Sequence, residues 1–168
     1  MTLSPNTLFD LSGKTALVTG GATGIGYMAA TGLMAAGARV LIASRKADAC
    51  VAAAAALNSA GLAGTAEGFG GDVASELGVA AVCEAVTVRT EKLDILVNNA
   101  GRSWGAPLGQ FPFEAWEKVM TLNVAGMFHL TQSLLPLLEA AAHTDDPARV
   151  INMGSVMGEV AMGDDAYS

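Results

Sequence analysis

The chain has 168 residues, of which 52% are hydrophobic and 15% are charged, and its formal net charge is −7. The hydrophobic share excludes intrinsic disorder, and the acidic balance argues against nucleic acid or anionic lipid as the main partner. The longest strictly apolar run, residues 49–57, is far shorter than the roughly 20 residues that a membrane-spanning helix needs. The stretch before Lys14 has no basic residue and no sustained apolar run, so it does not have the pattern of a secretory signal, and we expect a cytoplasmic protein without a membrane partner.

Short apolar strands alternate with longer helical stretches along the whole chain. In chain order we predict a strand at residues 16–20, a helix at 24–36, a strand at 38–44, a helix at 47–60, a strand at 64–69, a helix at 74–93, a strand at 93–101, a helical region at 113–142 that breaks near Asn123, and a strand at 148–155. Strands that are apolar throughout and separated by helices are typical of a parallel sheet covered on both faces. The predicted fold class is therefore α/β, a doubly wound parallel sheet of the Rossmann type with five strands, in a single domain over residues 1–168.

The turn after the first strand reads TGGATGIG, residues 19–26. Its glycines, Gly20, Gly24 and Gly26, have the spacing G-x-x-x-G-x-G. Glycine permits a tight turn and a close approach of the backbone to a pyrophosphate, and the following helix N-terminus then points at that group. A glycine-rich turn alone also fits an ordinary strand-to-helix connection, but its place between the first strand and the first helix favours a dinucleotide site.

This turn resembles the cofactor loop of the short-chain dehydrogenase/reductase family, and further motifs extend the resemblance. They are GDV at residues 71–73, NNAG at 98–101, LNV at 122–124 and INMGS at 151–155. Among subgroups, the segments NNAGRSWGAPL, WEKVMTLNV and LLPLLEAA look most like bacterial 3-oxoacyl-thioester reductases, including those of the rhamnolipid-pathway type. The resemblance implies a nicotinamide-dependent oxidoreductase that acts on a small carbonyl or alcohol substrate and, at full length, forms a homo-oligomer.

The resemblance also implies which residues bind the dinucleotide, with Asp72 near the adenine ring. Together with the residues after the second strand, the expected cofactor-binding set is Gly20, Thr23, Gly24, Ile25, Gly26, Ser44, Arg45, Asp72, Val73, Asn99, Ala100 and Gly101.

The residues after the second strand, LIASRK, bear on the choice between the two nicotinamide dinucleotides. A carboxylate there would accept a hydrogen bond from a free ribose 2′-hydroxyl, whereas the planar fork of Arg45, with Ser44 and Lys46 in support, suits a 2′-phosphate. The alternative is that Arg45 and Lys46 are solvated charges at a helix start. Thr23 stands where phosphate-specific relatives often carry a second basic residue. We expect NADP(H) rather than NAD(H).

Three residues match the catalytic positions that the resemblance implies. Ser155 would hydrogen-bond the substrate oxygen, Asn123 would hold a water, and Tyr167 would exchange a proton with that oxygen. An unperturbed tyrosine titrates near 10, and a cation about 4 Å away at an effective dielectric of about 20 lowers that pKa by about three units. The lysine that supplies this cation would be residue 171, after the last residue of the chain. In relatives with two tyrosines the second is catalytic, and the acid would then be residue 169 with Tyr167 beside it.

Two functions follow. The first is an NADP(H)-dependent reductase, with a 3-oxoacyl thioester as the expected substrate. The second is a truncated, non-catalytic dinucleotide-binding module, because the chain stops before the lysine and lacks the C-terminal part of the fold; on this hypothesis the 168-residue chain alone is inactive and its fifth strand is an exposed edge. No metal site is expected, because the cysteines Cys50 and Cys83 and the histidines His129 and His143 lack ligand spacing.

Overall fold

The computed structural model describes residues 8–158 and 165–167. Its main sheet has five parallel strands in the order β3-β2-β1-β4-β6. These strands are β1 (Thr15–Thr19), β2 (Arg39–Ser44), β3 (Thr65–Gly70), β4 (Ile95–Asn98) and β6 (Arg149–Asn152). The connecting helices are α2 (Gly24–Ala35), α3 (Ala47–Ser59), α4 (Glu76–Thr87), α5 (Phe113–Met120) and α6 (Met127–Ala141). The predicted doubly wound parallel sheet is confirmed.

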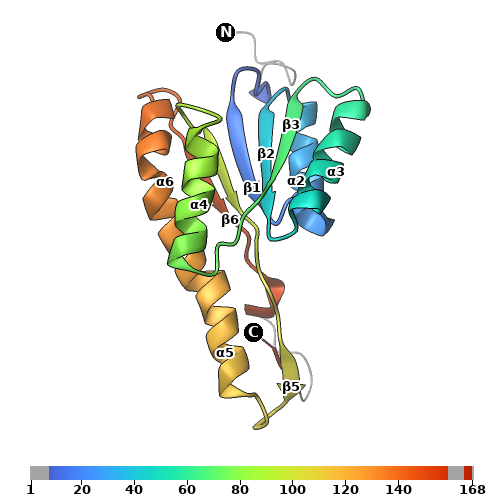
Figure 1. The fold of residues 1–168 in the computed structure, drawn as a ribbon, viewed down its shortest axis with the longest axis vertical. Helices are drawn as coiled ribbons and strands as arrows, with labels where there is room; N and C mark the ends of the chain where they lie inside the picture. The colour runs from blue at the N-terminus through green and yellow to red at the C-terminus, as the bar shows by residue number, and fades with distance from the viewer. Residues whose placement is uncertain (1–7, 159–164, 168) are drawn as a thin grey trace.

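The sheet separates two hydrophobic cores, one on each face. Helices α2 and α3 cover one face, where Met34 and Leu57 pack on Val18 and Ile42. Helices α4 and α6 cover the other face, and their leucine and valine side chains pack on Leu17 and its neighbours. Figure 1 shows the two helical layers on either side of the strands. No described helix meets the length and hydrophobicity of a membrane span.

The long helical region after β4 does not break at Asn123 but passes through a π-helical turn. This turn, η1, spans Thr121–Gly126 and joins α5 to α6. The predicted interruption is therefore in the right place, although the chain stays helical through it. Figure 1 shows α5 extending beyond the sheet, alongside β5.

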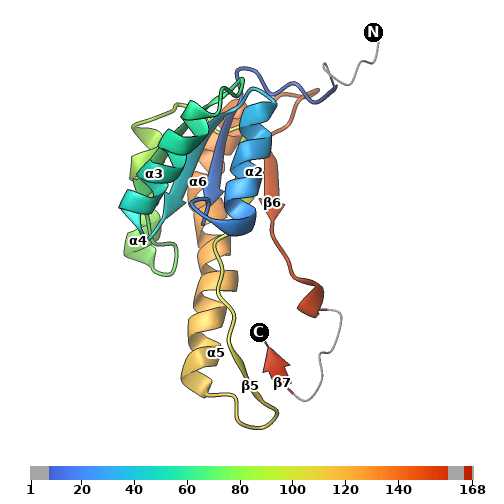
Figure 2. The same cartoon turned by 90° about the vertical axis from the view of Figure 1, so that its right-hand side faces the viewer.

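A second, two-stranded sheet was not predicted from the sequence. Its antiparallel strands are β5 (Gly105–Pro107) and β7 (Asp165–Tyr167), and Gly105 pairs with Tyr167. Figure 2 shows this small sheet away from the main one, reached from β6 through the 3₁₀ turn η2 (Val156–Gly158). Three-residue strands are too short to show an alternating pattern, and β5 also contains glycine and proline, which are rare inside strands.

Helix α4 begins as predicted but ends sooner. The hydroxyl of Ser75 accepts a hydrogen bond from the Gly78 amide at 3.1 Å, the N-cap expected there. The helix ends at Thr87 rather than near Leu93, because the Leu93 amide donates to the Leu137 carbonyl oxygen of α6 at 2.9 Å and not to its own helix. A tertiary contact thus overrides the local helical pattern.

The outer side of β3 is closed by a side chain of α3. The Asn58 amide nitrogen donates to the Ala66 carbonyl oxygen at 2.9 Å, and the Asn58 amide oxygen accepts from the Ala66 amide at 2.8 Å. Helix α3 comes this close because Gly68 has no side chain: a Cβ there would lie within 3 Å of the Cys50 carbonyl oxygen.

The opposite edge strand, β6, is exposed at all four of its residues, as expected for the fifth strand. Val150 and Ile151 are 41% and 44% exposed, and no strand of the described residues pairs with the outer side of β6. Ion pairs hold the loop that leads into β6. Asp146, in the loop before β6, forms ion pairs with Lys14 and Arg149, and Lys14 also contacts the buried Asp94 at 3.1 Å.

Candidate dinucleotide-binding site

A pocket of about 270 Å³ lies at the carboxyl ends of β1, β2, β3 and β4. In an open parallel sheet this is the edge where ligands bind, at the point where the strand order reverses, here between β1 and β4. The pocket brings together nine of the predicted cofactor-binding residues: Gly20, Thr23, Ser44, Arg45, Asp72, Val73, Asn99, Ala100 and Gly101. The other lining residues are Thr19, Ala43, Gly71 and Leu122, which lie within the quoted sequence segments but were not among the predicted cofactor-binding residues.

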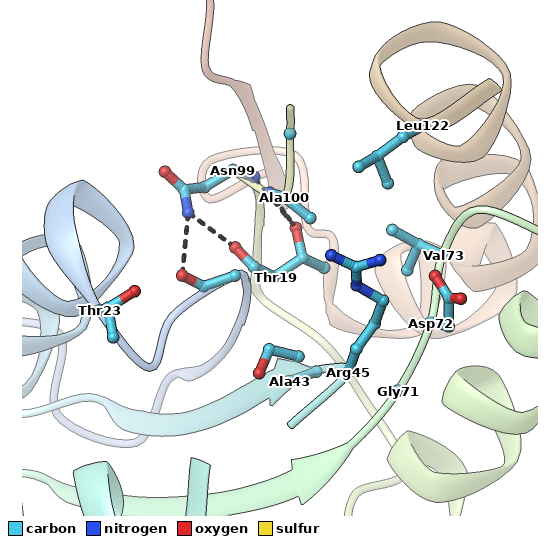
Figure 3. A pocket seen from close by; sticks show the side chains of 13 residues that line it. Thr19, Thr23, Ala43, Arg45, Gly71, Asp72, Val73, Asn99, Ala100 and Leu122 are labelled. Carbon is cyan, nitrogen blue, oxygen red and sulfur yellow. Dashed lines mark hydrogen bonds between the residues drawn. The ribbon is translucent and has the colours of Figure 1, made fainter. Parts of the chain in front are cut away.

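Thr19, the last residue of β1, locks the glycine turn to the end of β4. Its buried hydroxyl donates to the Val97 carbonyl oxygen at 3.3 Å and accepts from the amides of Asn99 and Ala100, both at 3.0 Å. The Asn99 side-chain nitrogen donates to the Thr19 and Gly20 carbonyl oxygens at 2.9 and 3.2 Å, as Figure 3 shows. The hydroxyl therefore uses its donor and both acceptor sites. Thr19 opens the TGGATGIG motif, but no sequence pattern indicated these hydrogen bonds.

The glycines of the turn are needed for different reasons. Gly24 has φ +55°, and a Cβ built on it meets nothing within 4 Å, so its outer side is open. Gly26 instead allows close packing, because a Cβ there would lie within 3 Å of the Gly20 carbonyl oxygen and the Asn99 side-chain nitrogen.

Helix α2 begins at Gly24, and the side chain of its N-cap, Thr23, makes no capping hydrogen bond. The amide groups of the first helical turn have no partner within the helix, and they carry the positive end of its dipole. Free amide groups at the start of a helix are a common site for phosphate groups in proteins. Ile25, which is 61% exposed, does not line the pocket, and neither do Gly24 and Gly26.

Arg45 is the basic group of the pocket. It is exposed, and among the described residues it pairs with no carboxylate. Figure 3 shows its guanidinium extending into the pocket, with Thr19 on one side and Asp72 on the other. One carboxylate oxygen of Asp72 accepts from the Ala74 amide at 3.0 Å, which holds the turn after β3. Lys46 is exposed and does not line the pocket.

The candidate catalytic residues are not part of this pocket's lining. The Asn123 side chain donates to the Arg102 carbonyl oxygen at 2.8 Å and accepts from the Arg102 amide at 3.0 Å, so it anchors the loop that follows Gly101. Ser155 is exposed, and its hydroxyl accepts from the Met157 amide at 3.2 Å. The backbone of Tyr167 pairs with Gly105 in the small sheet.

The cysteines and histidines form no metal centre within the part of the chain that the structure describes. Cys50 is buried, as interpreted from the sequence, whereas Cys83 is only partly buried, and both are free thiols. Partial burial raises the pKa of the Cys83 thiol.

Comparisons with known proteins agree with this geometry. The family model described as short chain dehydrogenase matches residues 14–168. A rhamnolipids biosynthesis 3-oxoacyl-[acyl-carrier-protein] reductase of Pseudomonas aeruginosa is 50% identical over 160 residues, which are 95% of this chain and 61% of that protein. A D-threitol dehydrogenase of Mycolicibacterium smegmatis is 36% identical over 92% of this chain and 57% of its own length.

Solved structures lead to the same family. The NADP active-site complex of Pseudomonas aeruginosa RhlG superposes with a TM-score of 0.87 at 50% identity, covering 96% of this chain and 61% of that one. A 3-oxoacyl (acyl-carrier-protein) reductase of Agrobacterium tumefaciens with NADP bound gives a TM-score of 0.80 at 28% identity, covering 93% of this chain and 58% of the other. The chain spans about three fifths of the length of these relatives. It belongs to the short chain dehydrogenase family.

Proposed function

We propose that the pocket binds NADP(H) in an oxidoreductase that transfers hydride between the nicotinamide and a carbonyl or secondary alcohol, with a 3-oxoacyl thioester as the substrate. The observation that carries the proposal is that one pocket at the carboxyl ends of the strands is lined by Gly20 of the glycine turn, by Thr23, the N-cap of α2, and by Arg45, which pairs with no carboxylate among the described residues. The reductase of Pseudomonas aeruginosa and the NADP complexes among the relatives support it.

Each part of the pocket has a distinct role in this proposal. The amides at the start of α2 bind the diphosphate, and the guanidinium of Arg45 binds the 2′-phosphate through charge-assisted hydrogen bonds. Asp72 and Val73 lie beside the adenine, and the segment Asn99–Gly101 forms the wall opposite them. When bound, the dinucleotide supplies the hydride donor or acceptor.

The remaining chemistry belongs to residues outside the pocket lining. Ser155 holds the substrate oxygen by a hydrogen bond, and the hydroxyl of Tyr167 exchanges a proton with that oxygen. Asn123 fixes the loop at Arg102, and this keeps the segment after β4 in place beside the substrate. Tyr167 needs a nearby cation to titrate close to neutral pH.

A second candidate is a module that binds the dinucleotide without turnover in this 168-residue form. It is favoured by the position of Asn123 and Ser155 outside the pocket lining and by the use of the Asn123 side chain in anchoring Arg102. Turnover separates the two functions. Oxidation of NADPH by this chain with a 3-oxoacyl thioester supports the reductase, and tight binding without turnover supports the module.

Calorimetry with NADP⁺ and NAD⁺ tests the cofactor. Because hydrogen bonds to charged groups contribute about 1.5–3 kcal/mol, Arg45→Gln should weaken NADP⁺ binding by about 10- to 100-fold and leave NAD⁺ binding nearly unchanged. Lys46→Gln is the matched control, since Lys46 is the neighbouring cation but does not line the pocket. Equal affinity of the wild-type chain for both dinucleotides would refute the preference, and binding of neither would refute the site.

A further inference from the structure

The turn that carries Arg45 is held by contacts on both sides of that residue. The Ser44 carbonyl oxygen accepts from the Gly71 amide at 2.8 Å, and the Ser44 hydroxyl accepts from the Lys46 amide at 3.3 Å. The Arg45 side chain itself is exposed and has no ion-pair partner among the described residues. The point from which this side chain extends is therefore set by the backbone of the turn.

A buried thiol completes this arrangement. The sulfur of Cys50 lies 3.0 Å from the Ser44 hydroxyl oxygen, within hydrogen-bonding distance. The Cys50 amide donates to the Lys46 carbonyl oxygen at 3.1 Å. Cys50 thus contacts the residue before Arg45 through its side chain and the residue after Arg45 through its backbone.

Cys50 has little freedom to move. It is fully buried and packs in the core formed by α2, α3 and their face of the sheet. The backbone of β3 at Gly68 approaches its carbonyl oxygen so closely that a Cβ on Gly68 would lie within 3 Å of it. A fixed residue that bonds both flanks of a turn preorganises the side chain that the turn presents.

We propose that Cys50 is a positioning residue for Arg45, and that the hydrogen bond between its thiol and the Ser44 hydroxyl sharpens selection of dinucleotides that carry a 2′-phosphate. This inference rests on the proposed binding of NADP(H) at the pocket. The planar fork of arginine binds phosphate well in only a narrow range of orientations. A looser turn therefore weakens binding of the phosphorylated dinucleotide and spares the other one.

The test compares two substitutions of similar size. Cys50→Ala removes the polar atom, whereas Cys50→Ser keeps a hydrogen-bonding group at the same place. Because a neutral hydrogen bond contributes about 0.5–1.5 kcal/mol, Cys50→Ala should weaken NADP⁺ binding by about two- to tenfold, with NAD⁺ binding unchanged. Cys50→Ser should retain most of the wild-type ratio of the two affinities. Both dissociation constants are measured by calorimetry below the melting temperature of each variant.

A double variant shows whether the effect passes through Arg45. In the Arg45→Gln background, Cys50→Ala should cause no further loss of NADP⁺ affinity. An equal loss for both dinucleotides, an unchanged affinity ratio in Cys50→Ala, or an additive loss in the double variant would overturn the inference. If the wild-type chain prefers NADP⁺, any of these three results overturns only the role of Cys50 and leaves the proposed function intact. Failure of the wild-type chain to bind either dinucleotide would overturn the proposed function, and this inference with it.

Discussion

The two edge strands of the main sheet, β3 and β6, differ in how their outer sides are covered. At β3, the Asn58 side chain bonds both backbone groups of Ala66 and takes the place of a neighbouring strand. At β6, the inner side pairs with β4, but all four residues are exposed and no strand of the described residues pairs with the outer side; ion pairs of Asp146 hold the loop before the strand. An edge with unpaired backbone groups attracts further strands. The comparison shows that a side chain of α3 closes the β3 edge at Ala66, whereas no strand of the described residues covers the outer side of β6.

The largest expected effect concerns the glycine that lets α3 approach the closed edge. Gly68→Val places a Cβ within 3 Å of the Cys50 carbonyl oxygen, and this backbone cannot rotate away as a side chain could. Forcing the layers apart should lower the free energy of unfolding by about 3 kcal/mol, measured by urea denaturation. Gly32→Ala is the control, because a Cβ at Gly32 in α2 meets nothing within 4 Å and should be neutral or stabilising. Equal stability of the two variants would contradict close packing at β3.

Removal of the edge cap itself should have a smaller effect. Asn58→Ala leaves both backbone groups of Ala66 to water, and since they are exposed we expect a loss of about 1 kcal/mol. Hydrogen exchange at the Ala66 amide should accelerate in this variant. In the control Ser59→Ala, the lost hydroxyl bonds only the Ala55 carbonyl oxygen of the same helix, so exchange at Ala66 should not change. Unchanged protection in Asn58→Ala would show that the amide does not close the edge.

At the open edge, the ion pairs before β6 predict a dependence on pH. Hydrogen bonds from Lys14, and then from Arg149, lower the pKa of Asp146 from 3.8 to about 2. A carboxyl group whose pKa is lowered on folding stabilises the fold above its unfolded pKa, and this contribution is lost as the pH falls from about 4 to about 2. Asp146→Asn should therefore be less stable than the wild type at pH 7 and approach it near pH 2. A stability difference that does not change with pH would contradict this.

The smallest expected effect on stability comes from a charge placed on the exposed edge strand β6. Ile151→Lys adds an ammonium group at an exposed position and should change the free energy of unfolding by no more than about 0.5 kcal/mol. Its effect should be on association, because lysine on an edge strand discourages pairing. The control is Leu77→Lys, which places the same charge at an exposed leucine of α4. In sedimentation velocity at increasing protein concentration, Ile151→Lys should self-associate less than Leu77→Lys. Equal self-association of the two variants would mean that the chain does not associate through β6.

The sequence predicted the parts of the fold that depend on local pattern. Four of the five strands coincide with apolar runs, and β3 lies in the predicted segment 64–69 although it contains glycines. The spacing of the glycines in residues 19–26 predicted the tight turn between the first strand and the first helix. The small sheet of β5 and β7 was missed because its pairing joins residues far apart in the chain. The early end of α4 was missed for a related reason, since the Leu93 amide finds its partner in α6.

The candidate site was predictable to a similar extent. Residues that present backbone or charge to the pocket, such as Gly20 and Arg45, lie in motifs. Thr19 acts through three hydrogen bonds that only the folded chain brings together. Asn123 was expected to hold a water, and the structure places its amide on the backbone of Arg102, a contact that no sequence spacing encodes.

The π-helical turn η1 also determines how the inward-facing side of α5 lines up with the inward-facing side of α6. Inward-facing positions run from Ala115 through Gly126 to Ala141. At 100° per residue, a regular α-helix would rotate this line by about 80° around the axis over that length, whereas one surplus residue in the wide turn reduces the rotation to about −20°. Deleting one residue between Thr121 and Gly126 would thus restore ordinary helical geometry and turn the buried leucines of α6, Leu130, Leu134 and Leu138, away from the sheet. This segment should therefore tolerate substitutions far better than a change of length.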